Sequence, residues 1–91
     1  MSLAILFTPQ GMDSQNYDQT LKELDAAGAG SPDGRLFHVA FSSAGVFRVL
    51  DVWESQEKFD AFGQTLMPIL QGSGIDPGQP EVAEVHNIIE G

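Results

Sequence analysis

The stretch that decides the fold is residues 35–54, RLFHVAFSSAGVFRVLDVWE. Two β-rich runs, 35–43 and 46–54, flank the dipeptide Ala44-Gly45, and this pattern predicts an antiparallel hairpin with a short turn. Along both runs the two alternating sets of side chains are largely apolar. A sheet built on this hairpin therefore has two apolar faces, and each of them needs a covering layer.

The segment before the hairpin predicts one strand and one helix. Residues 3–8 form a short apolar run that ends at Pro9 and Gly11, which is typical of a buried strand. Asp13 is the expected N-cap of a first helix, because its carboxylate can accept hydrogen bonds from free amides of the first turn. Glycines stop this helix, and residues 28–34 are expected to be a loop.

The segment after the hairpin predicts a second helix and a last strand. Ser55 is the expected cap of the helix, and Phe59 and Phe62 lie on its apolar stripe. Pro68 lacks an amide and clashes with the preceding turn, so the helix is expected to kink or restart near residues 65–67. Residues 72–80 are expected to be a loop and residues 81–89 the last strand.

The predicted order is β-α-β-β-α-β, which indicates an α+β, ferredoxin-like domain over residues 1–91. Its four-stranded antiparallel sheet carries both helices on one face. Because two helices cover only one of the two apolar faces, we expect a homodimer in which two sheets pack face to face. The alternative is a monomer whose loops 28–34 and 72–80 fold over the second face.

Composition excludes several classes of protein. The 91 residues contain four Lys and Arg against thirteen Asp and Glu, a net charge of −9, which argues against nucleic acid and anionic membrane as partners. The absence of cysteine excludes thiolate chemistry and cysteine-based zinc or iron–sulfur sites. No run of about 20 apolar residues and no secretory signal is visible, so cytoplasmic residence is expected.

The hairpin also brings chemistry-bearing residues together. With a two-residue turn, His38 lies directly opposite Asp51, and Trp53 lies on the same face. A carboxylate beside an imidazole fixes its tautomer, so the pair can act as an oriented general base or acid. Trp53 could supply a flat apolar wall for a planar ligand. The alternative is a buried polar pair that holds strand register, with Trp53 as part of the core.

Other residues are weaker candidates. His86 in the predicted last strand could be a second proton-transfer group, or could join the His38–Asp51 pair in a sparse metal set. That set lacks any ligand spacing signature, so no metal is expected. Arg48 could bind a substrate carboxylate or pair with a glutamate of a partner subunit.

Three further side chains could line a substrate pocket. Tyr17 begins the apolar stripe of the first helix, so its hydroxyl could reach a pocket, although a core aromatic with a solvated tip explains it equally well. Phe62 and Met67, both in the second helix, are candidate wall residues for a small-molecule ligand.

The stretch RVLDVWES at residues 48–55, followed by two phenylalanines in the next helix, resembles the dimeric α+β barrel superfamily of antibiotic-biosynthesis-monooxygenase-like proteins. Shorter stretches at 38–39, 66–68 and 80–87 are similar to a set of small uncharacterised bacterial proteins within that superfamily. The resemblance implies a ferredoxin-like protomer, a homodimeric barrel and a small cleft between sheet and helices.

The superfamily contains cofactor-free quinone-forming monooxygenases, haem-degrading enzymes, lactone isomerases and dechlorinating enzymes, so its fold alone defines no reaction. The predicted second helix has no histidine that could ligate haem, and no cofactor is expected. One hypothesis is a cofactor-free monooxygenase or isomerase on a small planar substrate, with His38 as base and Asp51 orienting it. The alternatives are a non-catalytic dimer that binds a small hydrophobic ligand, and a purely structural dimer.

Overall fold

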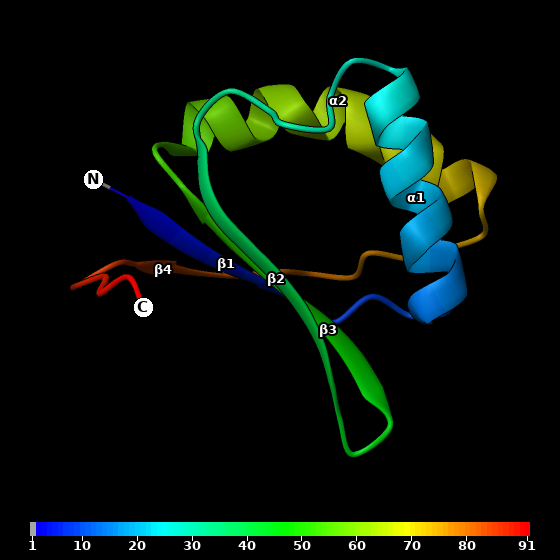
Figure 1. The fold of residues 1–91 in the computed structure, drawn as a ribbon, viewed down its shortest axis with the longest axis horizontal. Coiled ribbons are helices and arrows are strands. Elements are labelled where there is room, and N and C mark those ends of the chain that lie inside the picture. Colours follow the sequence, from blue (N-terminus) through cyan, green and yellow to red (C-terminus); the bar gives the residue numbers. More distant parts are fainter. Residues whose placement is uncertain (1) are drawn as a thin grey trace.

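Two helices lie on one face of a four-stranded antiparallel sheet, and the other face of the sheet is bare (Figure 1). This computed structural model describes residues 2–91. The strands neighbour one another in the order β2-β3-β1-β4. The expected α+β, ferredoxin-like arrangement is confirmed, with these elements in chain order: β1 (Leu3–Phe7), α1 (Ser14–Ala26), β2 (Arg35–Ser43), β3 (Val46–Trp53), α2 (Gln56–Gly72) and β4 (Glu81–Glu84).

The predicted short turn between β2 and β3 is confirmed and has two residues. Ala44 and Gly45 both have positive φ, 52° and 79°, which is the backbone of the tight hairpin turn that matches the twist of the flanking strands. From this turn the pairing runs in register to His38, which lies directly opposite Asp51.

A β-bulge at Leu36 interrupts that register and overturns one face assignment. Phe37 pairs with Val52, but the next pair along is Arg35 with Trp53, so Leu36 is an extra residue on β2. Strict alternation would place Leu36 on the same face as His38. Instead, Leu36 is 52% exposed, and Arg35 takes the place opposite the indole.

Both helix N-caps are confirmed. The Asp13 carboxylate accepts from the Asn16 amide at 2.9 Å, and the Asn16 side chain accepts from the Asp13 amide at 2.7 Å, forming a reciprocal capping box. The Ser55 hydroxyl accepts from the amide of Lys58.

Two expectations about the C-terminal half are corrected. The expected restart of helix α2 near residues 65–67 does not occur, because α2 runs on through Pro68 as one element; the alternative, a kink there, stays a prediction. A proline removes one hydrogen bond from a helix, and the packing of the flanking turns against the sheet holds this helix together. Strand β4 ends at Glu84 rather than at residue 89, because Glu84 already pairs with Leu3, the first residue of β1.

The core lies between the sheet and the helices. Ile5 and Trp53 are fully buried there and pack with Leu24 and Phe62. Burial of such a side chain contributes about 1.5–3 kcal/mol relative to leaving it in water. No helix within residues 2–91 is both long enough and apolar enough to cross a bilayer.

The opposite face of the sheet stays uncovered. Its apolar side chains include Phe37, Phe41 and Val46, which are 51%, 39% and 39% exposed. The two long loops do not fold over it. Loop 28–34 is tied to α2 by the ion pair between Asp33 and Lys58, and loop 72–80 pairs with the segment after β1.

The turn geometry yields a stability prediction. Ala44 adopts a left-handed conformation that costs a residue with a Cβ about 1–2 kcal/mol, and asparagine tolerates it better than alanine does. Ala44→Asn should therefore raise the free energy of unfolding by about 0.5–1 kcal/mol. Urea unfolding should show a higher midpoint with an unchanged m-value. Gly45→Ala should lower the midpoint, and a rise in that variant would contradict the turn geometry.

Candidate functional site

A chain of hydrogen bonds crosses from helix α1 to the middle of the sheet. The Tyr17 hydroxyl lies 2.5 Å from Nε2 of His38, and Nδ1 of the same imidazole lies 2.5 Å from Oδ1 of Asp51. Trp53 then donates from its indole N–H to Oδ2 of Asp51 at 3.3 Å. The predicted pairing of His38 with Asp51 is present, and it continues at both ends into a four-residue chain.

A neutral His38 gives an assignment of protons that satisfies every member of this hydrogen-bonded chain. Asp51 is 4% exposed and accepts from both Nδ1–H of His38 and the Trp53 indole, which supplies partners for a buried carboxylate. With its proton on Nδ1, the neutral imidazole has a free acceptor at Nε2. The Tyr17 phenol therefore donates to Nε2, and its oxygen keeps lone pairs directed away from the imidazole.

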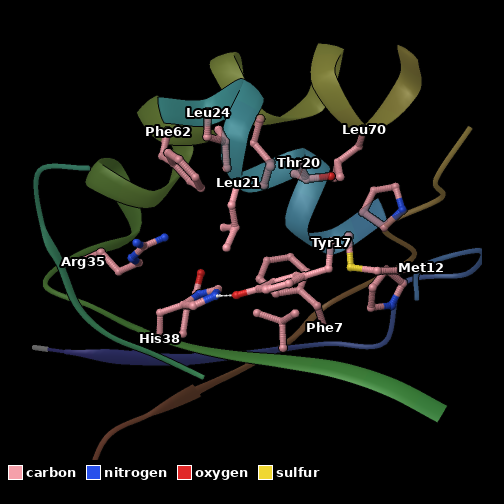
Figure 2. Close-up of a pocket in the computed structure, with 15 residues that line it drawn as sticks. Phe7, Met12, Tyr17, Thr20, Leu21, Leu24, Arg35, His38, Phe62 and Leu70 are labelled. Atoms are coloured by element: carbon pink, nitrogen blue, oxygen red, sulfur yellow. Dashed lines mark hydrogen bonds and ion pairs between the residues drawn. The ribbon is translucent and has the colours of Figure 1, made fainter. Parts of the chain in front are cut away.

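The Tyr17 end of the chain opens into a small apolar cavity between helices and sheet (Figure 2). Its volume is about 70 Å³. Two loops contribute Pro9 and Pro77 to the lining of this cavity. The pairing of Gln10 with Asp76 joins these two loops. Most of the side chains that line the cavity are apolar. They are Phe7, Pro9, Met12, Leu21, Leu24, Val49, Phe62, Leu66, Leu70 and Pro77.

A second, more open hollow of about 410 Å³ adjoins this cavity. It shares Tyr17, Leu21 and His38 with the cavity and extends between α1 and Gly30 of the following loop. Leu21, which is 38% exposed, stands between the two spaces. The hollow therefore adjoins the hydrogen-bonded chain at Tyr17 and His38.

Arg35 lines both spaces. The bulge at Leu36 places it opposite Trp53, on the helix side of the sheet. Sequence reasoning missed Arg35, because a regular hairpin would turn it away from His38. The sequence carries no clear signal of the bulge. In the structure, Gly34 precedes Arg35 with φ +90°, and a Cβ there would lie 2.6 Å from Lys58.

Of the other predicted site residues, Phe62 and Tyr17 line the cavity and the rest do not. Trp53 lies behind Asp51, packed against two phenylalanines of α2 with ring centroids 5.3 and 5.5 Å away. Met67 lines an open hollow elsewhere along α2, beside Phe59. The indole therefore holds the carboxylate and is not a wall of this cavity.

Arg48 and His86 lie away from the hydrogen-bonded chain. Arg48 pairs with Phe41 on the hairpin and is placed, by strand alternation, on the uncovered face of the sheet. His86 lies beyond the end of β4, where it is exposed, and not in the last strand as expected. Within residues 2–91, no three His, Asp or Glu side chains gather in a group that could hold a metal ion.

Burial alters the acidity of the phenol. Removal of the Tyr17 hydroxyl from water raises its pKa above the ordinary 10.0, the positive charge of Arg35 lowers it, and the Asp51 carboxylate raises it further. Tyr17 is therefore a neutral phenol at physiological pH. This protonation state agrees with its role as the donor to His38.

Comparison with known proteins identifies the fold. The chain matches solved structures of antibiotic-biosynthesis-monooxygenase-like proteins over nearly its whole length, and its ferredoxin-like fold is the fold of that group. No family model and no curated protein sequence matches the chain.

Three structures illustrate the likeness. A candidate antibiotic biosynthesis monooxygenase from Chloroflexus aurantiacus J-10-fl superposes with a TM-score of 0.67 and 14% identity, covering 99% of this chain and 98% of that one. SnoaB, a cofactor-independent oxygenase from Streptomyces nogalater, gives 0.63 and 12%, with 97% and 94% covered. The structural-genomics protein YJCS gives 0.66 and 11%, with 94% and 100% covered.

The phenol predicts a measurable titration, because Tyr17 is the only tyrosine of the chain. Absorbance at 295 nm should show a midpoint above 10.0 in the folded protein and near 10 in urea. The folded state binds this proton more tightly, so the stability it contributes is present below about pH 10 and is lost as pH rises through the folded pKa. Arg35→Gln should move the midpoint further upward. An ordinary midpoint in the folded protein would contradict the burial of the hydroxyl.

Proposed function

We propose that the protein is a cofactor-independent enzyme that removes a proton from a small planar organic substrate held in the cavity beside Tyr17. The observation that carries this proposal is the hydrogen-bonded chain from Tyr17 through His38 to Asp51, which ends at an apolar cavity. General bases work when they are oriented and partly shielded from water, and this chain satisfies both conditions.

The proton moves in a relay. The phenol oxygen of Tyr17 accepts the substrate proton as its own proton passes to Nε2 of His38. Asp51 stabilises the imidazolium that forms, because its carboxylate already accepts from Nδ1. No free phenolate needs to exist beforehand, which suits a buried phenol whose pKa is raised.

The deprotonated substrate then has one of two fates. In an isomerase, the relay returns the proton to a different carbon. In an oxygenase, an electron-rich phenol ring reduces O₂: the ring C–H becomes C=O, one oxygen atom enters the product, and the other leaves as water. The likeness to SnoaB, described as a cofactor-independent oxygenase, supports the second fate. In both reactions the protein transfers the proton and keeps water away from the deprotonated substrate.

Cavity size restricts the substrate. An apolar cavity of 150 Å³ is the size known to accept benzene, and the inner cavity here is about 70 Å³. A single ring must therefore use the adjoining hollow as well, with Leu21 displaced from between the two spaces. Single-ring phenols and enolisable lactones are the classes to test.

The relay is tested by proton exchange, which does not depend on the later fate of the substrate. Single-ring hydroquinones and enolisable lactones are incubated with the protein in D₂O under argon, and deuterium incorporation is followed by NMR. His38→Ala and Tyr17→Phe should each lower the exchange rate by about 10²–10⁴-fold, the usual contribution of a positioned acid or base. Admission of air then shows whether O₂ is consumed.

Two matched controls accompany these variants. His86→Ala removes the other histidine of the chain, and Met67→Leu changes an apolar side chain of α2 outside the cavity; both should keep at least half of the rate. Equal loss in His86→Ala, or full activity in His38→Ala, would contradict the relay. Saturable binding of the same compounds with no exchange would favour the non-catalytic ligand-binding alternative.

We also propose that the uncovered sheet face binds a second copy of the chain. Phe37, Phe41 and Val46 expose too much apolar surface for a face that stays in water. On this face, Nε of Arg48 is shut off from solvent and has no hydrogen-bond partner among residues 2–91. The other N–H groups of this partly exposed guanidinium remain able to pair with a carboxylate from a second copy. Because each copy carries a charge of −9, apolar contact must drive their association.

Sedimentation velocity tests this dimer. Phe41→Asp should convert a species of twice the chain mass into one of single mass, because two buried aspartates would face each other across the interface. Met67→Asp is the matched control, since Met67 is also 39% exposed but lies on α2, away from this face. A wild-type protein that sediments as a monomer at 100 μM would refute the dimer.

A further inference from the structure

Among residues 2–91, Arg35 is the one Lys or Arg side chain that lines the inner cavity, whose lining is otherwise mainly apolar. Figure 2 shows it extending toward the cavity from β2, at the same end as Phe62 and His38. The extra residue at Leu36 produces this placement, because it sets Arg35 opposite Trp53. β-Bulges commonly re-aim a side chain next to a functional site.

The contacts of the guanidinium leave most of its hydrogen-bonding capacity unused. It donates to the carbonyl of Gly30 at a long 3.3 Å, and it lies 5.9 Å from the ring centroid of Phe62. Among residues 2–91 no carboxylate lies within ion-pair distance of Arg35, although Asp25 lines the same outer hollow and Asp51 the same inner cavity. Five N–H donors are available on this side chain, and one weak bond occupies one of them.

A half-buried guanidinium without a counter-ion is costly in an apolar site, and it forms a strong, bidentate pair with a carboxylate when one is supplied. The negative charge of the protein makes a cation at position 35 more significant for ligand binding. Thirteen acidic side chains give the molecule a field that repels anions, so an anionic ligand needs a local anchor to bind at all. Lys22 stands at the outer hollow only, whereas Arg35 reaches both spaces.

We propose that Arg35 anchors a carboxylate of an anionic substrate, so that the single-ring phenols and lactones of the proposed function carry a carboxylate as well. This inference rests on the proposed function, which places the substrate in the cavity beside Tyr17, but it concerns substrate binding alone. The ring lies toward the apolar lining, the carboxylate pairs with the guanidinium, and the reacting end faces Tyr17. Arg35 is thus the residue that determines specificity, whereas the relay through His38 carries the chemistry.

The test compares two probes of nearly equal shape, benzoate and benzamide, which differ in charge. Calorimetry and Trp53 fluorescence at pH 7.5 should give benzoate at least tenfold tighter binding than benzamide, as expected for a charge-assisted pair. Arg35→Gln should reduce that ratio to about one, chiefly by weakening benzoate. Absence of benzoate binding to the wild type at 10 mM would overturn the proposal.

Two further variants separate the possible causes. Lys22→Gln removes the same charge from the outer hollow and should keep the tenfold preference, so an equal loss in Lys22→Gln and Arg35→Gln would overturn the specific anchor in favour of general electrostatics. His38→Ala should lose proton exchange and retain the preference for benzoate. Preference that survives in Arg35→Gln would refute the role of Arg35 and leave the relay unaffected.

Discussion

The two-residue turn at Ala44 and Gly45 fixes the register of the hairpin, and the rest of the site depends on that register. Side chains alternate along a strand, so a slip of one residue would move His38 to the uncovered face of the sheet. Asp51 would then lose its closest hydrogen-bond donor while remaining 4% exposed. Removing a hydrogen-bond donor from a buried carboxylate in this way costs about 1.5–3 kcal/mol, a large part of the stability of a domain of this size.

The predictions that succeeded depend on neighbours in the sequence. A short turn between two apolar runs sets its own register, so the pairing of His38 with Asp51 could be derived by counting from Ala44 and Gly45. Asp13 and Ser55 were identified as helix caps for the same reason, because a cap acts on amides two or three residues away. The order of the elements followed from these local signals and gave the ferredoxin-like fold.

The features that the sequence did not reveal depend on contacts between distant segments. Tyr17 was recognised as a pocket candidate, but its bond to His38 depends on how α1 is rotated above the sheet. The end of β4 depends on where β1 begins, and helix α2 persists through Pro68 because its packing outweighs one lost hydrogen bond. Arg35 was missed because an extra residue at Leu36 breaks the alternation on which the prediction relied.

Because of the bulge, the charge of the cavity depends on the number of residues before β2 as well as on which residues line it. Arg35 and Leu36 are adjacent, and the one that pairs with Trp53 faces the cavity. If one residue were deleted from loop 28–34, β2 would no longer need an extra residue at the bulge. Leu36 would then pair with Trp53 and face the cavity in place of Arg35. The anchoring end of the cavity would become apolar without substitution of any lining residue. In this scaffold, insertions and deletions in a surface loop are therefore a direct route to a new ligand preference.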